Sequence, residues 1–426
     1  MRAKGQMKYI PGWIFLMIIM SGQVLAHSGQ PKYHVIIDTD GGIDDMRAIS
    51  MLLAGNDIRV LAVNCSRGTL MPRTVFSKVH SLLSAFHHEG IPVGISRETD
   101  PDLPEWADFA KNIHWGNPLN HSSLDENNNA VDILNSVTEN YPDRITLVAL
   151  GSLKTYADWF RVNPDIVQKI ERIIWYNHPE TQRGFNYQLS PGSYEFIRNS
   201  AVSIETVANL SDNLTVNDTY LSTMQHVKSV YADQILYVHA QKPVKERIKQ
   251  DPMYLWDDMV PLYLTLPLLF DIESRDGITY ASIMPELPRD FVYETISKLL
   301  GSATSASNRV FIEFPVDTAL YLPEYAKMVN TTIEQYGLVE WKAISLTNEI
   351  HGHTGIYSII GAKMGIRAME YFNVGINNMK VVTFAGNDPP LSCFNDGIQI
   401  STGATIGQGL IMISDSISTI PSAIFT

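Results

Sequence analysis

Residues 33–45 of the chain read YHVIIDTDGGIDD, and this stretch decides the fold. Its first six residues form an apolar, β-branched run, which is typical of a strand buried in a parallel sheet. Two glycines follow and allow a tight turn, and the next segment has the apolar spacing of a helix. The folded part of the chain therefore begins with a strand, a carboxylate-rich turn and a helix.

The same alternation continues along the chain. We expect strands at 58–63, 91–95, 144–150 and 170–176, and helices at 46–53, 75–86 and 153–162. The run at 91–95 is the weakest, because its proline and glycine argue against a central position in a sheet. The alternation predicts an α/β domain, a mostly parallel sheet with helices on both faces. Ligands of such sheets bind outside the carboxyl ends of the strands, where the aspartate-rich turn lies.

The composition of the sequence changes near residue 320, after which a new helical pattern begins and Gly, Thr and Ser become frequent. A chain of 426 residues also exceeds the usual size of a single hydrophobic core. We place the boundary between residues 312 and 323. This gives a first domain at 27–320 and a smaller C-terminal α+β domain at 321–426.

The charge of the chain excludes one class of partner. The formal net charge is −13, and no cluster of Lys and Arg forms the basic face that a nucleic-acid binder needs. The acidic balance suits a metal cation or a small neutral ligand instead. We therefore expect a small-molecule ligand and no nucleic acid.

Residues 1–26 have the features of a signal peptide. Three positive residues precede the apolar run 13–20, which is too short to span a membrane, and Val24-Leu25-Ala26 fits the cleavage rule. The mature protein is expected to begin near His27, to be periplasmic or secreted, and to have no membrane association after cleavage. An uncleaved amphipathic anchor is the alternative. Cys65 and Cys393 are the two cysteines, and a lone pair is not a disulfide framework.

Four carboxylates lie within eight residues at the end of the first strand, on Asp38, Asp40, Asp44 and Asp45. They would repel one another strongly without a cation, and hard oxygen ligands select calcium or magnesium. In the alternative interpretation, Asp44 or Asp45 only caps the helix, and Asp38 and Asp40 are surface turn residues. We expect a cation site.

Residues 38–45 resemble the inosine–uridine-preferring nucleoside hydrolases, whose signature is DTDxGxDD after a strand. The resemblance implies that Asp38 and Asp45 bind calcium and that Asp44 holds the ribose hydroxyls. Asp40 is then the general base, which takes a proton from a water held by calcium. The implied reaction is hydrolysis of the N-glycosidic bond of a ribonucleoside or related riboside.

Three later segments extend the resemblance to about residue 270. LGSLK at 150–154 implies a calcium ligand in the backbone carbonyl of Lys154. Phe185-Asn186 implies that Asn186 contacts the sugar, and Trp256-Asp257 implies that Asp257 is a calcium ligand. A homodimer or homotetramer is also implied.

The departures from the family pattern fall on the substrate side of the site. Gly184 replaces the glutamate that would bind the 5′-hydroxyl, and Trp256 replaces a histidine. Asn177 is expected to stand for a sugar-binding asparagine, and residues 63–68 do not align. The metal half of the site is therefore closer to the family than the substrate half, and the nucleobase and sugar preference stay open.

Two other functions compete with this one. The run DTDG at 38–41 also fits a haloacid-dehalogenase-type phosphatase with a nucleophilic Asp38 and magnesium, although Asp44 and Asp45 are then unexplained. The second is a nucleoside- or sugar-binding protein with a degenerate hydrolase site. Gly184 supports this alternative, and Asp40 argues against it.

The C-terminal domain contains the run His351-Gly352-His353 and, later, Cys393. If the run is extended, both histidines face the same way, and with Cys393 they suit zinc or iron. Residues 341–414 resemble the E-type domain of formylmethanofuran dehydrogenase, in which HGH also occurs. Hydrogen-bonded structural histidines are the alternative. We expect an accessory role in substrate binding or assembly.

Overall fold

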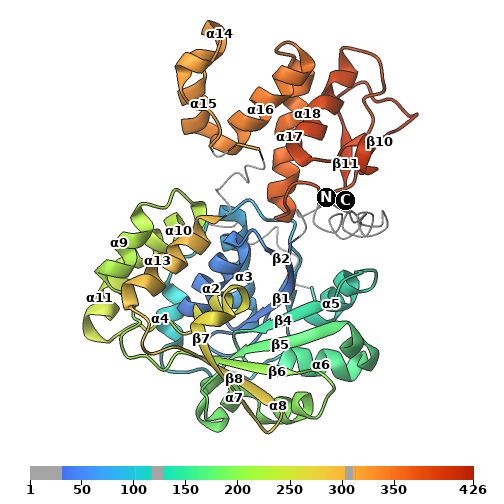
Figure 1. The fold of residues 1–426 in the computed structure, drawn as a ribbon. Coiled ribbons are helices and arrows are strands. Elements are labelled where there is room, and N and C mark those ends of the chain that lie inside the picture. The colour runs from blue at the N-terminus through green and yellow to red at the C-terminus, as the bar shows by residue number, and fades with distance from the viewer. Residues whose placement is uncertain (1–30, 101, 118–127, 303–309, 312) are drawn as a thin grey trace, which may run out of the picture.

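The computed structural model describes residues 31–100, 102–117, 128–302, 310–311 and 313–426. The predicted signal peptide at 1–26 lies outside the described residues. Figure 1 shows a large α/β body that carries a smaller domain, coloured orange to red, at one end. Within the described residues, no helix is long and apolar enough to cross a membrane.

The larger body is built on an eight-stranded sheet with the order β3-β2-β1-β4-β5-β6-β8-β7. The strands are β1 (Tyr33–Thr39), β2 (Ile58–Cys65), β3 (Val93–Ile95), β4 (Ile145–Ala149), β5 (Ile170–Tyr176), β6 (Ile204–Ala208), β7 (Phe270–Arg275) and β8 (Ile278–Ile283). Every neighbouring pair is parallel except β7 and β8. The predicted mostly parallel sheet is confirmed, and β3, with its glycine, lies at an edge.

Helices cover both faces of this sheet because side chains of a strand alternate between them. Ile37 belongs to a core that β1 shares with α2 (Ile43–Ala54), α3 (Pro72–Ala85), α9 (Asp218–Gln225), α10 (Val230–Ala240), α12 (Met259–Thr265) and α13 (Arg289–Leu300). Ile36 belongs to the opposite core, with α5 (Ala130–Thr138), α6 (Lys154–Val162) and α8 (Pro191–Arg198). The shorter helices α4 (Ala107–Asn112), α7 (Phe185–Leu189) and α11 (Lys242–Gln250) complete the body.

The carboxyl end of β1 sets the position of the aspartate-rich turn. Asp38 pairs in register with Asn64 of β2 and Ala149 of β4, so the turn leaves from the middle of the sheet. Gly41 adopts a φ of 82°, a left-handed conformation in which side chains are strained. The chain therefore reverses within two residues, and α2 begins with Asp44 and Asp45 in its first turn.

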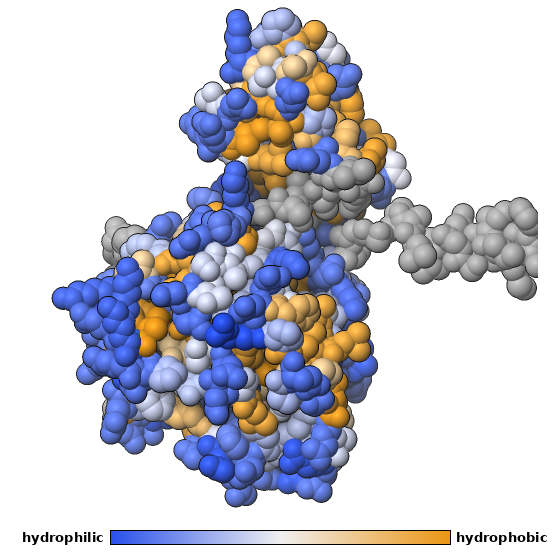
Figure 2. Space-filling view, turned by 60° about the vertical axis from the view of Figure 1, so that its left-hand side comes forward, coloured by the Kyte–Doolittle hydropathy of each residue, from blue (hydrophilic) through white to orange (hydrophobic). Residues whose placement is uncertain are grey.

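The second domain combines helices with a three-stranded sheet of order β10-β9-β11, as the predicted α+β class requires. Its elements are α14 (Pro323–Ala326), α15 (Val329–Tyr336), α16 (Leu338–His351), α17 (Ile356–Phe372), α18 (Phe394–Thr402), β9 (Val381–Thr383), β10 (Ile411–Ile413) and β11 (Ala423–Phe425). Figure 2 shows apolar surface gathered on this domain, where Leu320, Leu322 and Ile350 are exposed. Cys65 and Cys393 are both free thiols.

The C-terminal end of α17 joins the second domain to residues 87–90 of the first. Arg367 forms an ion pair of 3.0 Å with Glu89, and the amide of Gly90 donates to the carbonyl of Tyr371 at 2.9 Å. His88 is buried there, and its Nδ1 lies 2.6 Å from the carbonyl oxygen of Glu370. The two domains are thus tied by specific polar contacts.

Candidate active site

A cavity of about 470 Å³ opens at the carboxyl ends of the parallel strands. Segments from the whole length of the first domain line it. The residues that the following paragraphs use are Asp40, Asp44, Asp45, Arg47, Thr69, Trp106, Asn177, Gly184, Phe185, Asn186, Tyr254, Trp256 and Asp257. Its place agrees with the expectation from the strand order.

Three carboxylates converge in this cavity, those of Asp44, Asp45 and Asp257, with one oxygen of each within 4.8 Å of the others. The first turn of α2 supplies two of them, and the third lies just before α12. Burial raises the pKa of all three, and the charge of Asp45 adds to the rise at the other two; that of Asp44 reaches about 7. Without a cation these groups resist ionisation together.

The cluster has the properties of a site for a hard cation. Oδ1 of Asp257 is buried and has no hydrogen-bond partner among the described residues, which leaves it free to act as a ligand. All the donor atoms are carboxylate oxygens, the ligand type that calcium and magnesium prefer. Within the described parts of the chain, this is the one acidic or His/Cys group with metal-binding spacing.

Asp40 lies in the same cavity, and its Oδ1 is buried without a hydrogen-bond partner among the residues that the structure describes. Backbone packs closely around its other oxygen, because a Cβ built on Gly68 would lie 2.1 Å from Oδ2. Burial, followed by the charge of Asp45, raises the pKa of this carboxyl well above its usual range, while a hydrogen bond from Thr69 opposes the rise. Asp40 therefore presents one unpartnered oxygen, which can take a proton.

Asp38 lies outside the carboxylate cluster and does not line the cavity. Its Oδ1 accepts a hydrogen bond of 2.6 Å from Ser66, and burial raises its pKa to about 8. A phosphatase nucleophile must reach the substrate, so this placement removes the basis of the phosphatase interpretation. Asp44, predicted to hold ribose, takes the third position in the cluster, and the calcium role of Asp38 gains no support.

Asp45 also fixes the turn that carries Asp40. Its Oδ1 accepts hydrogen bonds from the Thr39 hydroxyl at 2.6 Å and from the Asp40 amide at 3.0 Å. The same carboxylate therefore orients the turn and offers its other oxygen to the cluster. Such a double use couples the position of Asp40 to that of the cation site.

The other predicted residues are only partly brought together. Asn186 and Asn177 line the cavity, and Asn186 donates to the carbonyl of Leu150 at 2.7 Å. Lys154 begins α6, pairs with Asp158 at 2.5 Å, and is not among the residues that line the cavity. A carbonyl ligand at Lys154 stays a prediction.

Gly184 approaches Asn177 so closely that a Cβ there would lie 1.8 Å from the amide oxygen of Asn177. The glutamate expected from the resemblance therefore has no room at this backbone position. The loss of that side chain and the placement of Asn177 are one structural change. The substrate side of the cavity differs from the family pattern for a steric reason.

Aromatic side chains form two walls that sequence reasoning missed. Trp106 packs edge-on against Phe185 with a ring distance of 5.1 Å, and Tyr254 stacks on Trp256 at 5.7 Å. Such walls suit a flat, apolar leaving group. Trp106 and Tyr254 lie in loops without a local pattern, so no signal in the sequence marked them.

The second domain does not assemble the predicted site for zinc or iron. His351 is the last residue of α16, and Gly352 has a φ of 78°, so the HGH run is not extended as expected. The two imidazole rings lie 4.2 Å apart, but Cys393 joins them in no three-ligand group among the described residues. His351 instead lies 3.7 Å from the carboxylate of Asp396.

Two comparisons of sequence agree with this division of the chain. A model of the inosine-uridine preferring nucleoside hydrolases matches residues 35–284, and a model named FmdE, of the molybdenum formylmethanofuran dehydrogenase operon, matches residues 350–420. A pyrimidine-specific ribonucleoside hydrolase of Klebsiella pneumoniae is 28% identical over 188 residues, 40% of this chain and 58% of that protein. Uridine nucleosidase 1 of Arabidopsis thaliana is 28% identical over 148 residues, 33% of this chain and 43% of that protein. The chain spans about half the length of these relatives.

Solved structures share the fold. A plant nucleoside hydrolase superposes with a TM-score of 0.53 at 18% identity, covering 64% of this chain and all of that chain. A purine-preferring ribonucleoside hydrolase from Gardnerella vaginalis gives 0.50 at 14% identity, covering 63% and 99%. Since the first model spans more than half of the 426 residues and meets the carboxylate-lined cavity, the chain belongs to the inosine-uridine preferring nucleoside hydrolase family.

Proposed function

We propose that the first domain is a calcium-dependent hydrolase that cleaves the N-glycosidic bond of a ribonucleoside or related riboside. One observation carries the proposal: the unpartnered oxygen of Asp40 faces the same cavity in which Asp44, Asp45 and Asp257 converge. The relatives whose names state an activity act on ribonucleosides or uridine. Calcium would be held by the three clustered carboxylates, where it supplies a Lewis acid that orients water and the ribose hydroxyls.

The chemistry asks three things of the chain. Oδ1 of Asp40 takes a proton from water as the water oxygen bonds to the anomeric carbon. The bond from that carbon to the base nitrogen breaks, and its electron pair leaves with the base. The surrounding carboxylates stabilise the positive charge that develops on the sugar ring. The aromatic pair Trp106 and Phe185 excludes water from the departing base.

The proposal is tested with a panel of purine and pyrimidine nucleosides, with and without a calcium chelator. Release of free base and reducing sugar that the chelator abolishes, and that Asp40→Asn lacks, is the expected result. If no nucleoside releases sugar while calorimetry detects nucleoside binding, the chain is a binding protein with a degenerate site. That outcome would follow from the altered substrate side at Gly184 and Asn177.

We also propose that the protein is exported and forms a homodimer or homotetramer. Export rests on the charge, apolar run and cleavage motif of residues 1–26. Sequencing of the N-terminus after expression should begin near His27, and retention of residue 1 would contradict export. Light scattering of the purified protein tests the assembly, since a single-chain mass would contradict it.

A further inference from the structure

A buried ion pair joins α2 to the segment that precedes α12. Arg47 Nε donates to Oδ1 of Asp258 at 2.9 Å, and its Nη2 donates to Oδ2 at 2.8 Å. Both side chains are completely buried. Arg47 lies on the helix that carries Asp44 and Asp45, and Asp258 directly follows Asp257. The pair therefore connects the two parts of the chain that supply the carboxylate cluster.

The same guanidinium makes further contacts with this segment. Nη2 of Arg47 donates to the carbonyl of Tyr254 at 3.2 Å, and Nη1 contacts the sulfur of Met253 at 3.8 Å. Tyr254 and Trp256 form the stacked wall of the cavity. One side chain of α2 thus holds residues 253–258, including a cluster carboxylate and an aromatic wall.

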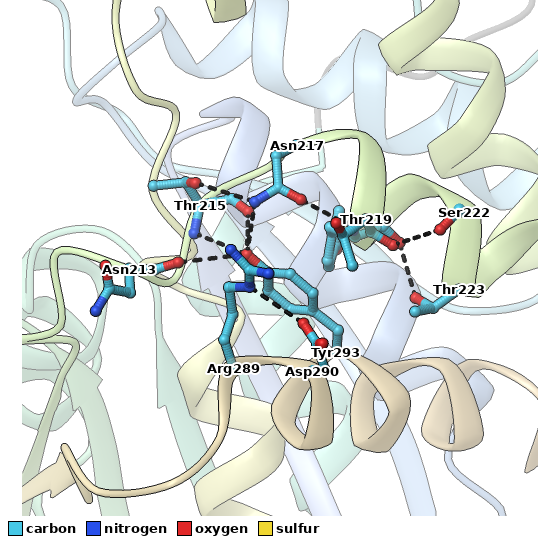
Figure 3. Close-up of polar contacts among 10 residues, drawn as sticks. Asn213, Thr215, Asn217, Thr219, Ser222, Thr223, Arg289, Asp290 and Tyr293 are labelled. Atoms are coloured by element: carbon cyan, nitrogen blue, oxygen red, sulfur yellow. Dashed lines mark hydrogen bonds and ion pairs between the residues drawn. The ribbon is translucent and has the colours of Figure 1, made fainter.

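The opposite side of this segment is held by backbone pairing. The amide of Val216 donates to the carbonyl of Met253 at 2.7 Å, and the amide of Leu255 donates to Leu214 at 2.9 Å. Figure 3 shows how Tyr293 of α13 supports residues 213–217: its hydroxyl donates to the carbonyl of Thr215 at 2.7 Å and accepts from the Asn217 amide. These contacts place the segment on α9 and α13. Arg47 is the side chain that sets its distance from α2.

Energetics favour a positioning role over a stabilising one. A buried ion pair gains little net stability, because desolvation of both charges offsets their attraction. A bidentate guanidinium–carboxylate pair does, however, fix both distance and orientation. We propose that Arg47 and Asp258 are positioning residues, which hold Asp257 at ligand distance from Asp44 and Asp45 and thereby set the cation affinity. The inference rests on the proposed cation-dependent function.

The test compares three variants by direct calcium titration in a calorimeter, without nucleoside. Arg47→Leu/Asp258→Leu removes both charges, because a single substitution would leave a charge buried at a cost of about 3–5 kcal/mol. It should retain the wild-type circular dichroism spectrum and bind calcium about 10–100-fold more weakly, the usual effect of losing an outer partner of a ligand. Arg47→Lys keeps the charge but loses the fork and should be intermediate.

The matched control is Arg172→Leu/Glu205→Leu, which removes a 3.0 Å ion pair between β5 and β6 whose residues do not line the cavity. Its calcium affinity should equal that of the wild type. Wild-type affinity in either folded Arg47 variant overturns the positioning role. Absence of calcium binding by the wild-type protein overturns the proposed function as well, so the two failures are distinguishable.

Discussion

Asp45 and Asp257 present carboxylate oxygens within 4.8 Å of one another, from near the beginning and near the end of the hydrolase domain. Both are buried, and burial raises the pKa of each. This pairing makes the chain sensitive to the cation, because only a bound cation relieves the repulsion when both are ionised.

Asp257→Asn should weaken calcium binding by about 100-fold or more, since loss of a direct ligand exceeds the roughly 10–100-fold effect of an outer partner. The calcium-free variant should unfold at a temperature equal to or above that of the calcium-free wild type, because one repelling charge is gone. Calorimetric titration and thermal unfolding measure the two effects. Asp251→Asn is the control: this carboxylate also lines the cavity but is exposed and pairs with Arg247 at 3.1 Å, so the calcium affinity should not change.

Removal of calcium should make stability depend on pH in a defined direction. The pKa of Asp44 is raised to about 7 and that of Asp38 to about 8, so the folded state binds protons that the unfolded state has released. Stability of the chelated protein should therefore fall as pH rises from about 4 to about 8. Calcium should stabilise most at the upper end, because its ligands must be deprotonated. Equal calcium stabilisation at both ends of this range would contradict the cluster.

Asp40→Asn should lower kcat about 10²–10⁴-fold, the usual worth of a general base, while KM changes little. The reason is that the amide cannot take the proton that Oδ1 of Asp40 accepts. Steady-state assays of sugar release measure the loss, and a preserved unfolding temperature shows that the fold is intact. Wild-type kcat in the variant would assign the proton transfer to another group.

Gly184→Ala should destabilise the protein by about 1–3 kcal/mol, the usual cost of overpacking, and raise KM. The new methyl group would lie 1.8 Å from the amide oxygen of Asn177, which must move. Gly192→Ala is the matched control, because nothing lies within 4 Å of its Cβ position, and stability should stay equal or rise. Denaturant unfolding compares the two, and equal stabilities would contradict the close contact.

Acid should weaken the connection between the domains through His88. Burial lowers the pKa of His88 to about 4, and in the fold its Nδ1 donates to Glu370 while its Nε2 accepts from the Tyr231 hydroxyl. The unfolded chain takes up a proton near its ordinary pKa of about 6.5, so stability falls as pH drops from there toward about 4. Between about pH 7.5 and about pH 5 the loss should be about 2 kcal/mol.

His88→Gln removes this titration, so its stability should fall less over the same pH interval, as measured by urea unfolding. The other titrating groups are common to both proteins and cancel in the comparison. Parallel pH profiles for wild type and variant would show that His88 does not titrate between the two states.

The sequence by itself determined the alternation of strands and helices and the place of the aspartate-rich turn. These are local properties, because strand and helix periods and the glycines of a turn act over a few residues. The turn at Gly41, the edge position of β3 and the presence of Asp40 in the cavity all followed from such patterns.

The tertiary structure decided which side chains meet. At the end of β1, the hydrogen bonds of Asp45 to Thr39 and of Ser66 to Asp38 direct Asp38 away from the cavity, so Asp44 joins the cluster instead. The left-handed Gly352 likewise ends the extended arrangement expected for HGH. Arg47 and Asp258 are 211 residues apart, and no local period relates them; packing of α2 against α12 alone brings a buried charge to its partner.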